Sequence, residues 1–371
     1  DTGSNPVRGV GWAMRAISIK VGTPGASLVE VPEPQRRKGE VLLRTLYTGI
    51  CGTDRGLVGN QLSFARPPPG SASLVIGHEA LARVEDIDPG IKLRKGSLVV
   101  PMVRRPGKCL NCLIGRQDNC SDGDFVEAGI RGLDGFMRDY FTDDPTYLVR
   151  VEDESLGMLA VLTEPLKNIV KAYDVYDLVS RRAITNCRDG SRSCLTVTIA
   201  GAGPIGMLFA MMFNSVGMDV KIFSRHDPNG TLSEMASKIG AEYFLREDRS
   251  KPIPPSDVFV ETSGSPNVAL DGIRALRPNG VAILFGTAPS GSEPVSGQDV
   301  IDIVERNITV IGTVDGAKEH YIRALSYLSS WKDSYPGVLK SMITAIVSPE
   351  EAPPILAEKP RGEIKSVIKW E

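Results

Sequence analysis

LTVTIAGAGPIG, the stretch from Leu195 to Gly206, decides the fold of the chain around it. Its apolar first half is typical of a buried strand, its glycines follow at once, and a helical pattern continues to Val216. A G-x-G-x-x-G between a strand and a helix indicates a dinucleotide site, because it allows a tight turn and close approach of a pyrophosphate to the helix N-terminus. The alternative is a glycine-rich turn without a ligand, and the strand–turn–helix context argues against it.

Alternating strands and helices continue after this turn. The strand-like runs are Asp219–Phe223, Asp257–Glu261, Gly280–Phe285 and Ile308–Gly312. This alternation predicts a doubly wound α/β unit. From Met14 to about Asp144, short β runs punctuated by Gly and Pro predict an antiparallel, barrel-like domain, followed by a helix from Thr163 to about Leu178.

The predicted division places residues 14–180 and 316–371 in the β-rich domain and 181–315 in the dinucleotide-binding domain. A length of 371 residues is ample for two cores. The segment from about Gly316, with a strand-like end at 365–370, is expected to return to the first domain. Residues 1–13 are interpreted as an upstream extension or a scar, because the first strand pattern begins at Met14.

Charge and hydropathy exclude several classes of protein. The formal net charge is −2 with both signs interspersed, which gives no footprint for nucleic acid or an anionic membrane. The apolar run Leu195–Met218 carries glycines and a proline near its start, where a membrane helix would break. Asp1–Lys20 lacks the features of a signal peptide. We therefore expect a soluble, cytoplasmic protein.

Two short motifs suggest a metal. Gly49–Asp54 reads GICGTD and Gly77–Ala80 reads GHEA, in a half of the chain that has no other histidine. Together they supply a thiolate, an imidazole and a carboxylate, a set that suits a catalytic zinc with one open position. A buried cysteine and a satisfied core histidine are the alternative for either residue alone.

The other cysteines form two groups. Cys109, Cys112 and Cys120 have the C-x2-C-x7-C spacing of a structural zinc loop, but Pro106 stands where a fourth cysteine would be. The site is therefore predicted to be incomplete, unless a nearby Asp or a water completes it. Cys187 and Cys194 are expected to be reduced thiols in a cytosolic protein.

The end of the second strand predicts the cofactor. An NAD site usually places an acid about 20 residues after the glycines, whereas this chain has Ser224-Arg225-His226. Arg225 could pair with a 2′-phosphate, so NADP is predicted, with NAD as an alternative. Asp227, next to Pro228, is interpreted as a turn residue.

The chain resembles the zinc-dependent medium-chain dehydrogenases, and within them the archaeal glucose 1-dehydrogenase group. Beyond the two metal motifs and Gly203–Gly206, the residues that carry the resemblance are Cys109–Arg116, Glu127–Ile130, Asp134–Arg138 and Gly362–Lys365. The resemblance covers nearly the whole chain from Met14. It implies a β-rich GroES-like catalytic domain joined to a Rossmann domain.

The resemblance also implies roles for individual residues. Cys51, His78 and Glu164 match zinc ligands, and Glu79 lies beside or on the metal. Thr53 matches the residue that hydrogen-bonds the reacting hydroxyl. The sugar-site positions are Thr53, Glu79, Glu127, Glu164, Asn168 and Asp315. The cofactor positions are Gly201, Ala202, Gly203, Pro204, Ile205, Gly206, Ser224, Arg225, His226, Phe285, Gly286, Thr287, Thr313, Val314, Asp315 and Lys359.

Several positions depart from the group's pattern. Asn168 stands where the group often has Asp, and Asp315 where it often has Asn. Met102 or Val103 replaces an expected Asn. Gly56 occupies the place of a proton-relay histidine found in many alcohol dehydrogenases, so Glu79 or a water must carry the proton. These changes leave the preferred aldose open.

The implied activity is zinc-dependent oxidation of an aldose at C1 to the lactone, with hydride transfer to NADP, in a homo-oligomer (dimer or tetramer). A zinc polyol or secondary-alcohol dehydrogenase is the nearest alternative. A non-catalytic nucleotide-binding relative and a zinc-free quinone reductase would not need Cys51, His78 and Glu164.

Overall fold

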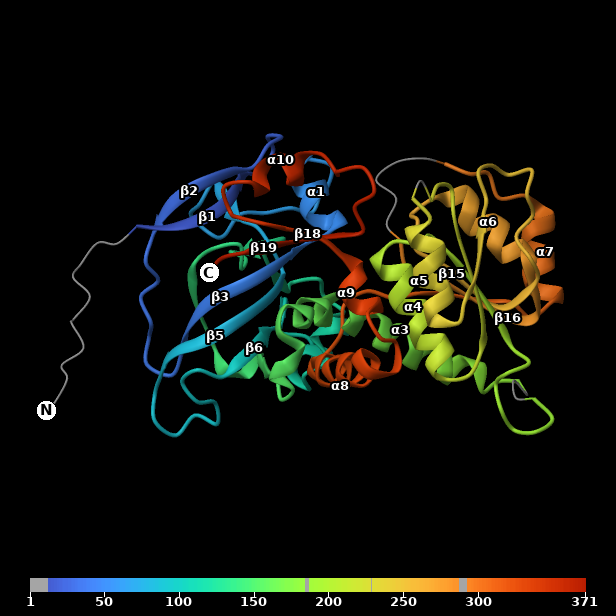
Figure 1. Ribbon diagram of the computed structural model, residues 1–371, viewed down its shortest axis with the longest axis horizontal. Helices are drawn as coiled ribbons and strands as arrows, with labels where there is room; N and C mark the ends of the chain where they lie inside the picture. Colours follow the sequence, from blue (N-terminus) through green and yellow to red (C-terminus); the bar gives the residue numbers. More distant parts are fainter. Residues whose placement is uncertain (1–12, 184–186, 228, 287–291) are drawn as a thin grey trace, which may run out of the picture.

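The computed structural model describes residues 13–183, 187–227, 229–286 and 292–371. Two lobes lie side by side, a β-rich lobe that holds both ends of the described chain and an α/β lobe built from its middle (Figure 1). The first strand, β1, begins at Ala13. Nearly all of the proposed extension, residues 1–13, therefore lies outside the described part.

The α/β lobe contains one six-stranded sheet in the order β14-β13-β12-β15-β16-β17, and every pair in it is parallel. Its strands are β12 (Thr196–Ala200), β13 (Asp219–Ser224), β14 (Glu242–Leu245), β15 (Ser256–Glu261), β16 (Leu276–Leu284) and β17 (Thr309–Gly312). Its helices are α4 (Pro204–Ser215), α5 (Thr231–Ile239), α6 (Pro266–Ala275) and α7 (Gly297–Glu305). The predicted doubly wound unit is confirmed. The helix after the glycines starts earlier than the pattern predicted, because Pro204 is accommodated in its first turn.

The β-rich lobe is built on a seven-stranded sheet, β11-β6-β5-β3-β19-β18 with β10 also beside β3. These strands are β3 (Val41–Ile50), β5 (Glu79–Ile87), β6 (Leu98–Pro101), β10 (Tyr140–Asp143), β11 (Leu148–Arg150), β18 (Ile343–Val347) and β19 (Lys365–Lys369). Two three-stranded sheets complete the lobe: β1 (Ala13–Lys20) with β2 (Ser27–Pro32) and β4 (Ser73–Val75), and β7 (Arg104–Arg105) with β8 (Val126–Ala128) and β9 (Gly132–Leu133). The expected β-rich domain is thus present.

The C-terminal segment returns to the β-rich lobe, as predicted, where β19 pairs antiparallel with β3 (Figure 1). The returning helices are α8 (Lys318–Ser334), α9 (Val338–Met342) and α10 (Ala352–Ala357). Helix α3 (Thr163–Ser180) packs on α8 and α4, and a continuous apolar core includes Leu81, Leu166, Phe209 and Tyr321. The domain boundaries near residues 180 and 316 stay a prediction.

Cys187 and Cys194 are joined by a disulfide with their Cα atoms 5.7 Å apart, so the expectation of reduced thiols is wrong. A tight turn between them explains the pairing: the backbone N–H of Gly190 donates to the carbonyl of Cys187, which folds the loop back on itself. The resulting Cα separation is the usual one for a disulfide.

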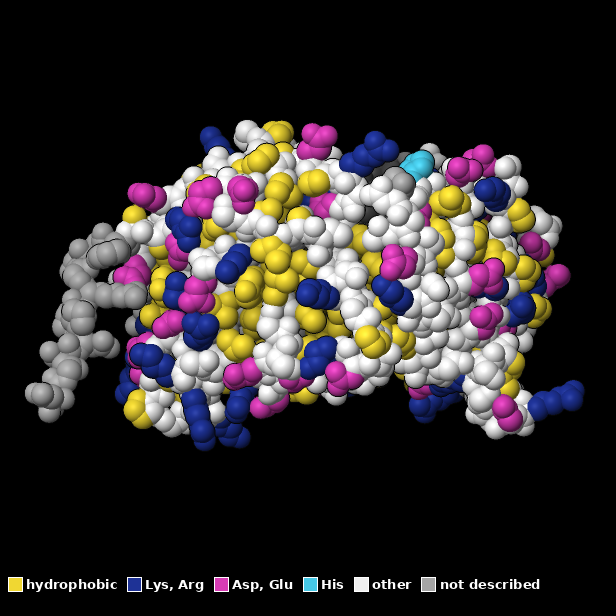
Figure 2. Space-filling view, viewed as in Figure 1, with side chains coloured by type: hydrophobic (Ala, Val, Ile, Leu, Met, Phe, Trp, Pro, Cys, Tyr) yellow, Lys and Arg dark blue, Asp and Glu magenta, His cyan; other side chains and the backbone are white. Residues whose placement is uncertain are grey.

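The apolar run Leu195–Met218 divides into β12, the glycine turn and α4. No helix in the described ranges has the length and apolarity needed to cross a bilayer. On the face shown in Figure 2, basic and acidic side chains are interspersed.

Candidate active site

Cys51 and His78 are brought together by the ends of two neighbouring strands. Cys51 follows β3 and caps α1 (Gly52–Val58), where the backbone N–H of Thr53 donates to its Sγ at 3.2 Å. His78 precedes β5 and follows Gly77, whose φ of +92° requires glycine. A Cβ at Gly77 would also lie 2.3 Å from Cγ of Met137. The predicted pair therefore meets, with Sγ of Cys51 3.1 Å from Nε2 of His78.

Two carboxylates lie beside this pair. Donor atoms of His78, Glu79 and Glu164 lie within 4.8 Å of one another, and all three side chains are buried. Glu164 comes from the first turn of α3. Sulfur, nitrogen and oxygen donors gathered in a buried site fit a zinc ion, since such a set would be costly to bury without a cation. Cys51, His78 and Glu164 are the residues that could hold it.

Asp54 is a functional candidate that the motif contained but to which sequence reasoning gave no role. Its Oδ1 lies 3.2 Å from Nδ1 of His78, and its Oδ2 accepts from the backbone N–H of Cys51 at 2.9 Å. Although burial opposes it, His78 holds the pKa of Asp54 below its ordinary value. A carboxylate on the far ring nitrogen orients a metal-binding imidazole. Its place within the GICGTD motif was the available signal.

Glu79 contacts Lys365 of β19, and both side chains are buried. Gly49 makes room for them, since a Cβ there would lie 2.2 Å from Oε2 of Glu79. Burial raises the pKa of Glu79, and Lys365 opposes that rise. The geometry therefore favours Glu79 beside the metal donors over Glu79 as a ligand. Sequence reasoning missed Lys365, although it lies in the GEIK motif.

One cavity of about 590 Å³ joins the metal donors to the α/β lobe. It is lined by Cys51, Thr53, His78, Glu79 and Glu164, by Glu127 and Asn168, and by Ile205, Phe285, Gly286, Thr313, Val314 and Asp315. The predicted metal, sugar and nicotinamide-end residues are thus brought together. Val103, and not Met102, is the one of that pair that lines the cavity. Thr287 lies outside the described residues.

The glycine turn has the conformation that its sequence predicts. Gly201 has a φ of +99°, and a Cβ at Gly206 would lie 1.8 Å from the carbonyl oxygen of Gly201. Helix α4 starts at Pro204, so its free N–H groups face the end of β12. Ala202 and Gly203 line a second cavity, whereas Ile205 lines the first. This turn therefore fits a pyrophosphate that passes between the two cavities.

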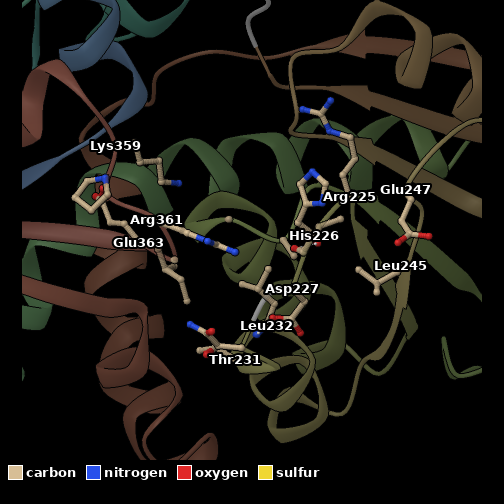
Figure 3. A pocket seen from close by; sticks show the side chains of 17 residues that line it. Arg225, His226, Asp227, Thr231, Leu232, Leu245, Glu247, Lys359, Arg361 and Glu363 are labelled. Carbon is tan, nitrogen blue, oxygen red and sulfur yellow. Dashed lines mark hydrogen bonds between the residues drawn. The ribbon is translucent and has the colours of Figure 1, made fainter.

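The second cavity, of about 690 Å³, has Arg225 and His226 on one wall and Lys359 and Arg361 on the other (Figure 3), and Ser224 also lines it. Ser224 is engaged with the hydroxyl of Tyr243 at 2.7 Å and donates to the carbonyl of His226 at 2.9 Å. Arg361 was missed by sequence reasoning, because it belongs to the returning segment and no local pattern marks it.

Three acids line this cavity, and each has a partner; the exposed Glu247 lies 3.6 Å from Lys251. Asp227 accepts from the backbone N–H groups of Leu232 and Ser233 at 3.1 and 2.9 Å, which supports its interpretation as a turn residue. Glu363 holds Arg55 through contacts of 2.9 and 2.7 Å. Arg225, Lys359 and Arg361 make no ion pair with any residue that the structure describes. The cavity thus offers free positive charge, which fits a phosphate group.

The sugar end of the first cavity is lined by paired charges. Glu127 accepts from Arg104 at 3.0 and 2.8 Å and from Arg131 at 2.7 Å. Asp315 contacts Lys167, which is also 3.1 Å from Glu164. Asn168 donates to the carbonyl of Glu164 at 3.2 Å. Sequence reasoning found the carboxylates but missed their cationic partners.

The cysteine loop gathers its three sulfurs within 4.8 Å of one another. Oδ1 of Asp124 lies 3.5 Å from Sγ of Cys120, and Asp124 sits so close to Gly107 that a Cβ there would be 1.5 Å from Oδ1. The backbone N–H of Ser121 donates to Sγ of Cys109 at 3.4 Å. Three sulfurs fit a structural zinc, and Asp124, beside Cys120, is a carboxylate that could supply the donor that Pro106 cannot.

We therefore expect two zinc ions per chain. Asp124→Ala should release one of them and leave turnover of the freshly purified protein nearly unchanged, because this loop offers no open position for substrate. Metal analysis after extensive dialysis measures the stoichiometry, with Asp122→Ala in the same loop as the control. One zinc in the unaltered chain would show that the cysteine loop is vacant.

Comparison with known proteins gives two family matches. Residues 37–153 match the alcohol dehydrogenase GroES-like domain, and residues 157–370 match the glucose dehydrogenase C-terminus. The two matches meet at the start of the segment that leads into α3.

Individual relatives agree along nearly the whole chain. A glucose 1-dehydrogenase of Thermoplasma acidophilum is 47% identical over 92% of this chain and 94% of its own. A glucose 1-dehydrogenase of Metallosphaera sedula is 43% identical over 96% and 99%. The structure of Haloferax mediterranei glucose dehydrogenase in complex with NADP, Zn and gluconolactone is similar with a TM-score of 0.84, at 28% identity and over 96% and 99% of the two chains.

Proposed function

This chain belongs to the glucose dehydrogenase family, and from that premise we propose that it oxidises a glucose-like aldose at C1 to the lactone with NADP as hydride acceptor. The observation that carries the proposal is the first cavity. Three groups of residues line this one cavity: donors suited to zinc, the loops at the nicotinamide end of the dinucleotide site, and two carboxylates, Glu127 and Asp315, that suit sugar hydroxyls.

Cys51, His78 and Glu164 would hold a zinc ion, which would act as a Lewis acid that favours ionisation of the C1 hydroxyl, and NADP would serve as the hydride acceptor. The residues of the chain do the rest. Glu127 and Asp315 accept hydrogen bonds from the sugar and orient C1. Thr53 accepts a hydrogen bond from the C1 hydroxyl and relays its proton by giving up its own to Glu79 or water, since Gly56 offers no side chain for a relay in this cavity. Phe285 and Gly286 hold the nicotinamide end.

A substrate screen tests the proposal. Measure kcat/KM with NADP for glucose, galactose, xylose, sorbitol and a short secondary alcohol, with and without a chelator. A site built on hydroxyl hydrogen bonds should favour the best aldose over the simple alcohol by about 10⁴-fold, because that alcohol leaves buried polar groups unpaired. If sorbitol or the simple alcohol is the better substrate, the chain is a polyol or secondary-alcohol dehydrogenase instead.

We also propose that the chain forms a dimer or tetramer. Strand β17 is an edge of the parallel sheet and exposes Val310, and α7, the helix before it in the chain, exposes Val300, Ile301 and Val304. A sheet edge and exposed apolar side chains are features that a second copy could cover. Sedimentation should show a dimer or a larger oligomer, and Val304→Lys should shift the population toward monomer.

The cytoplasmic location and the absence of a nucleic-acid partner remain predictions.

A further inference from the structure

Arg104 lies behind the sugar end of the first cavity, and we propose that it is the positioning residue of the sugar site. Its guanidinium holds Glu127 and Asp315 as a fixed pair of hydrogen-bond acceptors. The inference rests on the function proposed above and adds to it the group that sets the geometry of sugar recognition.

Arg104 contacts two carboxylates from distant parts of the chain. It lies on β7 and is 5% exposed. Its Nε and Nη2 donate to Oε1 of Glu127 on β8 at 3.0 and 2.8 Å, and its Nε lies 3.1 Å from Oδ2 of Asp315 in the turn after β17. Glu127 and Asp315 line the cavity, whereas Arg104 is not among the described residues that line it. One buried cation therefore contacts both carboxylates and holds them close together.

Asp315 still has capacity for a ligand. Although burial opposes it, Lys167 and Arg104 hold the pKa of Asp315 below its ordinary value. Its Oδ1 is engaged by Lys167. Its buried Oδ2 lies 3.1 Å from Nε of Arg104 but makes no hydrogen bond with any described residue. A buried acceptor that lacks a hydrogen bond is costly. A hydroxyl group donated by a bound sugar would satisfy it.

The remaining contacts of Arg104 hold the guanidinium in one orientation. Its Nη1 donates to the carbonyls of Gln117 and Asp118 at 3.4 and 3.3 Å, and the guanidinium lies over the ring of Phe125 at 3.8 Å. Gln117 and Asp118 belong to the cysteine loop. These contacts point in different directions, so they need the planar fork of arginine and cannot be reproduced by lysine.

The strand supplies a matched control. Arg105, the next residue, also pairs with a carboxylate, Asp143, at 2.5 Å and stacks over an aromatic ring, Tyr147, at 4.3 Å. It is not among the described residues that line either cavity. Arg104→Gln and Arg105→Gln therefore remove similar interactions, and only the first is next to the sugar carboxylates.

The test compares Michaelis constants. Arg104→Gln and Arg104→Lys should each raise the KM for the best aldose about tenfold or more, the scale of a lost charge-assisted contact. The KM for NADP should stay within about twofold, and Arg105→Gln should leave both constants near the values of the unaltered chain. In a Glu127→Gln background, Arg104→Gln should add much less than it does alone, because interacting residues are not additive. Arg104→Lys provides the measurement if the glutamine variant does not fold.

Two results would overturn the proposal. One is an unchanged sugar KM in the Arg104 variants. The other is a loss of specificity, seen either as a rise in the KM for NADP equal to the rise for the sugar or as an effect of Arg105→Gln equal to that of Arg104→Gln. Either would indicate a general loss of structure. A protein that oxidises no aldose in unaltered form would instead contradict the proposed function, so the two failures can be told apart.

Discussion

Replacing His78 by Ala is expected to remove the catalytic zinc and to lower turnover by at least about 10³-fold. His78 is the residue shared by the two donor groups of the site, the one with Cys51 and Asp54 and the one with Glu79 and Glu164. Its loss would remove the nitrogen donor common to both groups, so the remaining donors should not retain the ion. Metal analysis and a glucose assay on the same preparation measure both effects.

The neighbouring Asp54 makes this prediction sharper. Asp54→Asn keeps the shape of the side chain but loses its charge toward Nδ1 of His78, so zinc affinity should fall about 10- to 100-fold with partial activity at saturating zinc. His226→Ala is the control, because His226 lines the other cavity and should leave the zinc content unchanged. A His78→Ala protein with normal zinc and normal turnover would contradict the assignment.

The fold could be predicted because its signals are local. The strand, glycines and helix of the dinucleotide turn are contiguous, and the close approach of Gly206 to the carbonyl of Gly201 is what the motif demands. Periodic strands in the α/β lobe were found for the same reason. The start of α4 was placed too late, since apolar spacing does not register the preference of proline for a first helical turn.

The partners of the site residues could not be predicted, because they are far away in sequence. Glu79 is held by Lys365 of the returning strand, and Asp315 by Lys167 and Arg104. A charge motif identifies a carboxylate but not the cation that the fold places on it. Asp124 could have been proposed from the sequence as a fourth donor, because it lies only four residues after Cys120.

The cofactor site shows the same limit and leads to the second large effect. Sequence reasoning assigned the 2′-phosphate to Arg225 alone, whereas the cavity also has Arg361 and Lys359 on its facing wall (Figure 3). Of the three acids that line it, Asp227 and Glu363 are engaged by other residues, and Glu247 lies 3.6 Å from Lys251. A phosphate in this cavity would therefore meet cations from both lobes.

Arg225→Ala and Arg361→Ala are each expected to raise the KM for NADP about tenfold. The double variant should raise it further, but by less than the roughly 100-fold product, because both residues would contact the same phosphate. The KM for NAD, which lacks the phosphate, should change by less than about twofold.

Arg249→Ala is the matched control, because Arg249 is paired with Asp271 and is not among the described residues that line either cavity. Initial rates with both cofactors at saturating glucose provide the constants. Equal effects on NAD and NADP would show that these arginines support the fold of the cavity and do not read the phosphate. An effect confined to Arg225 would assign recognition to the α/β lobe alone.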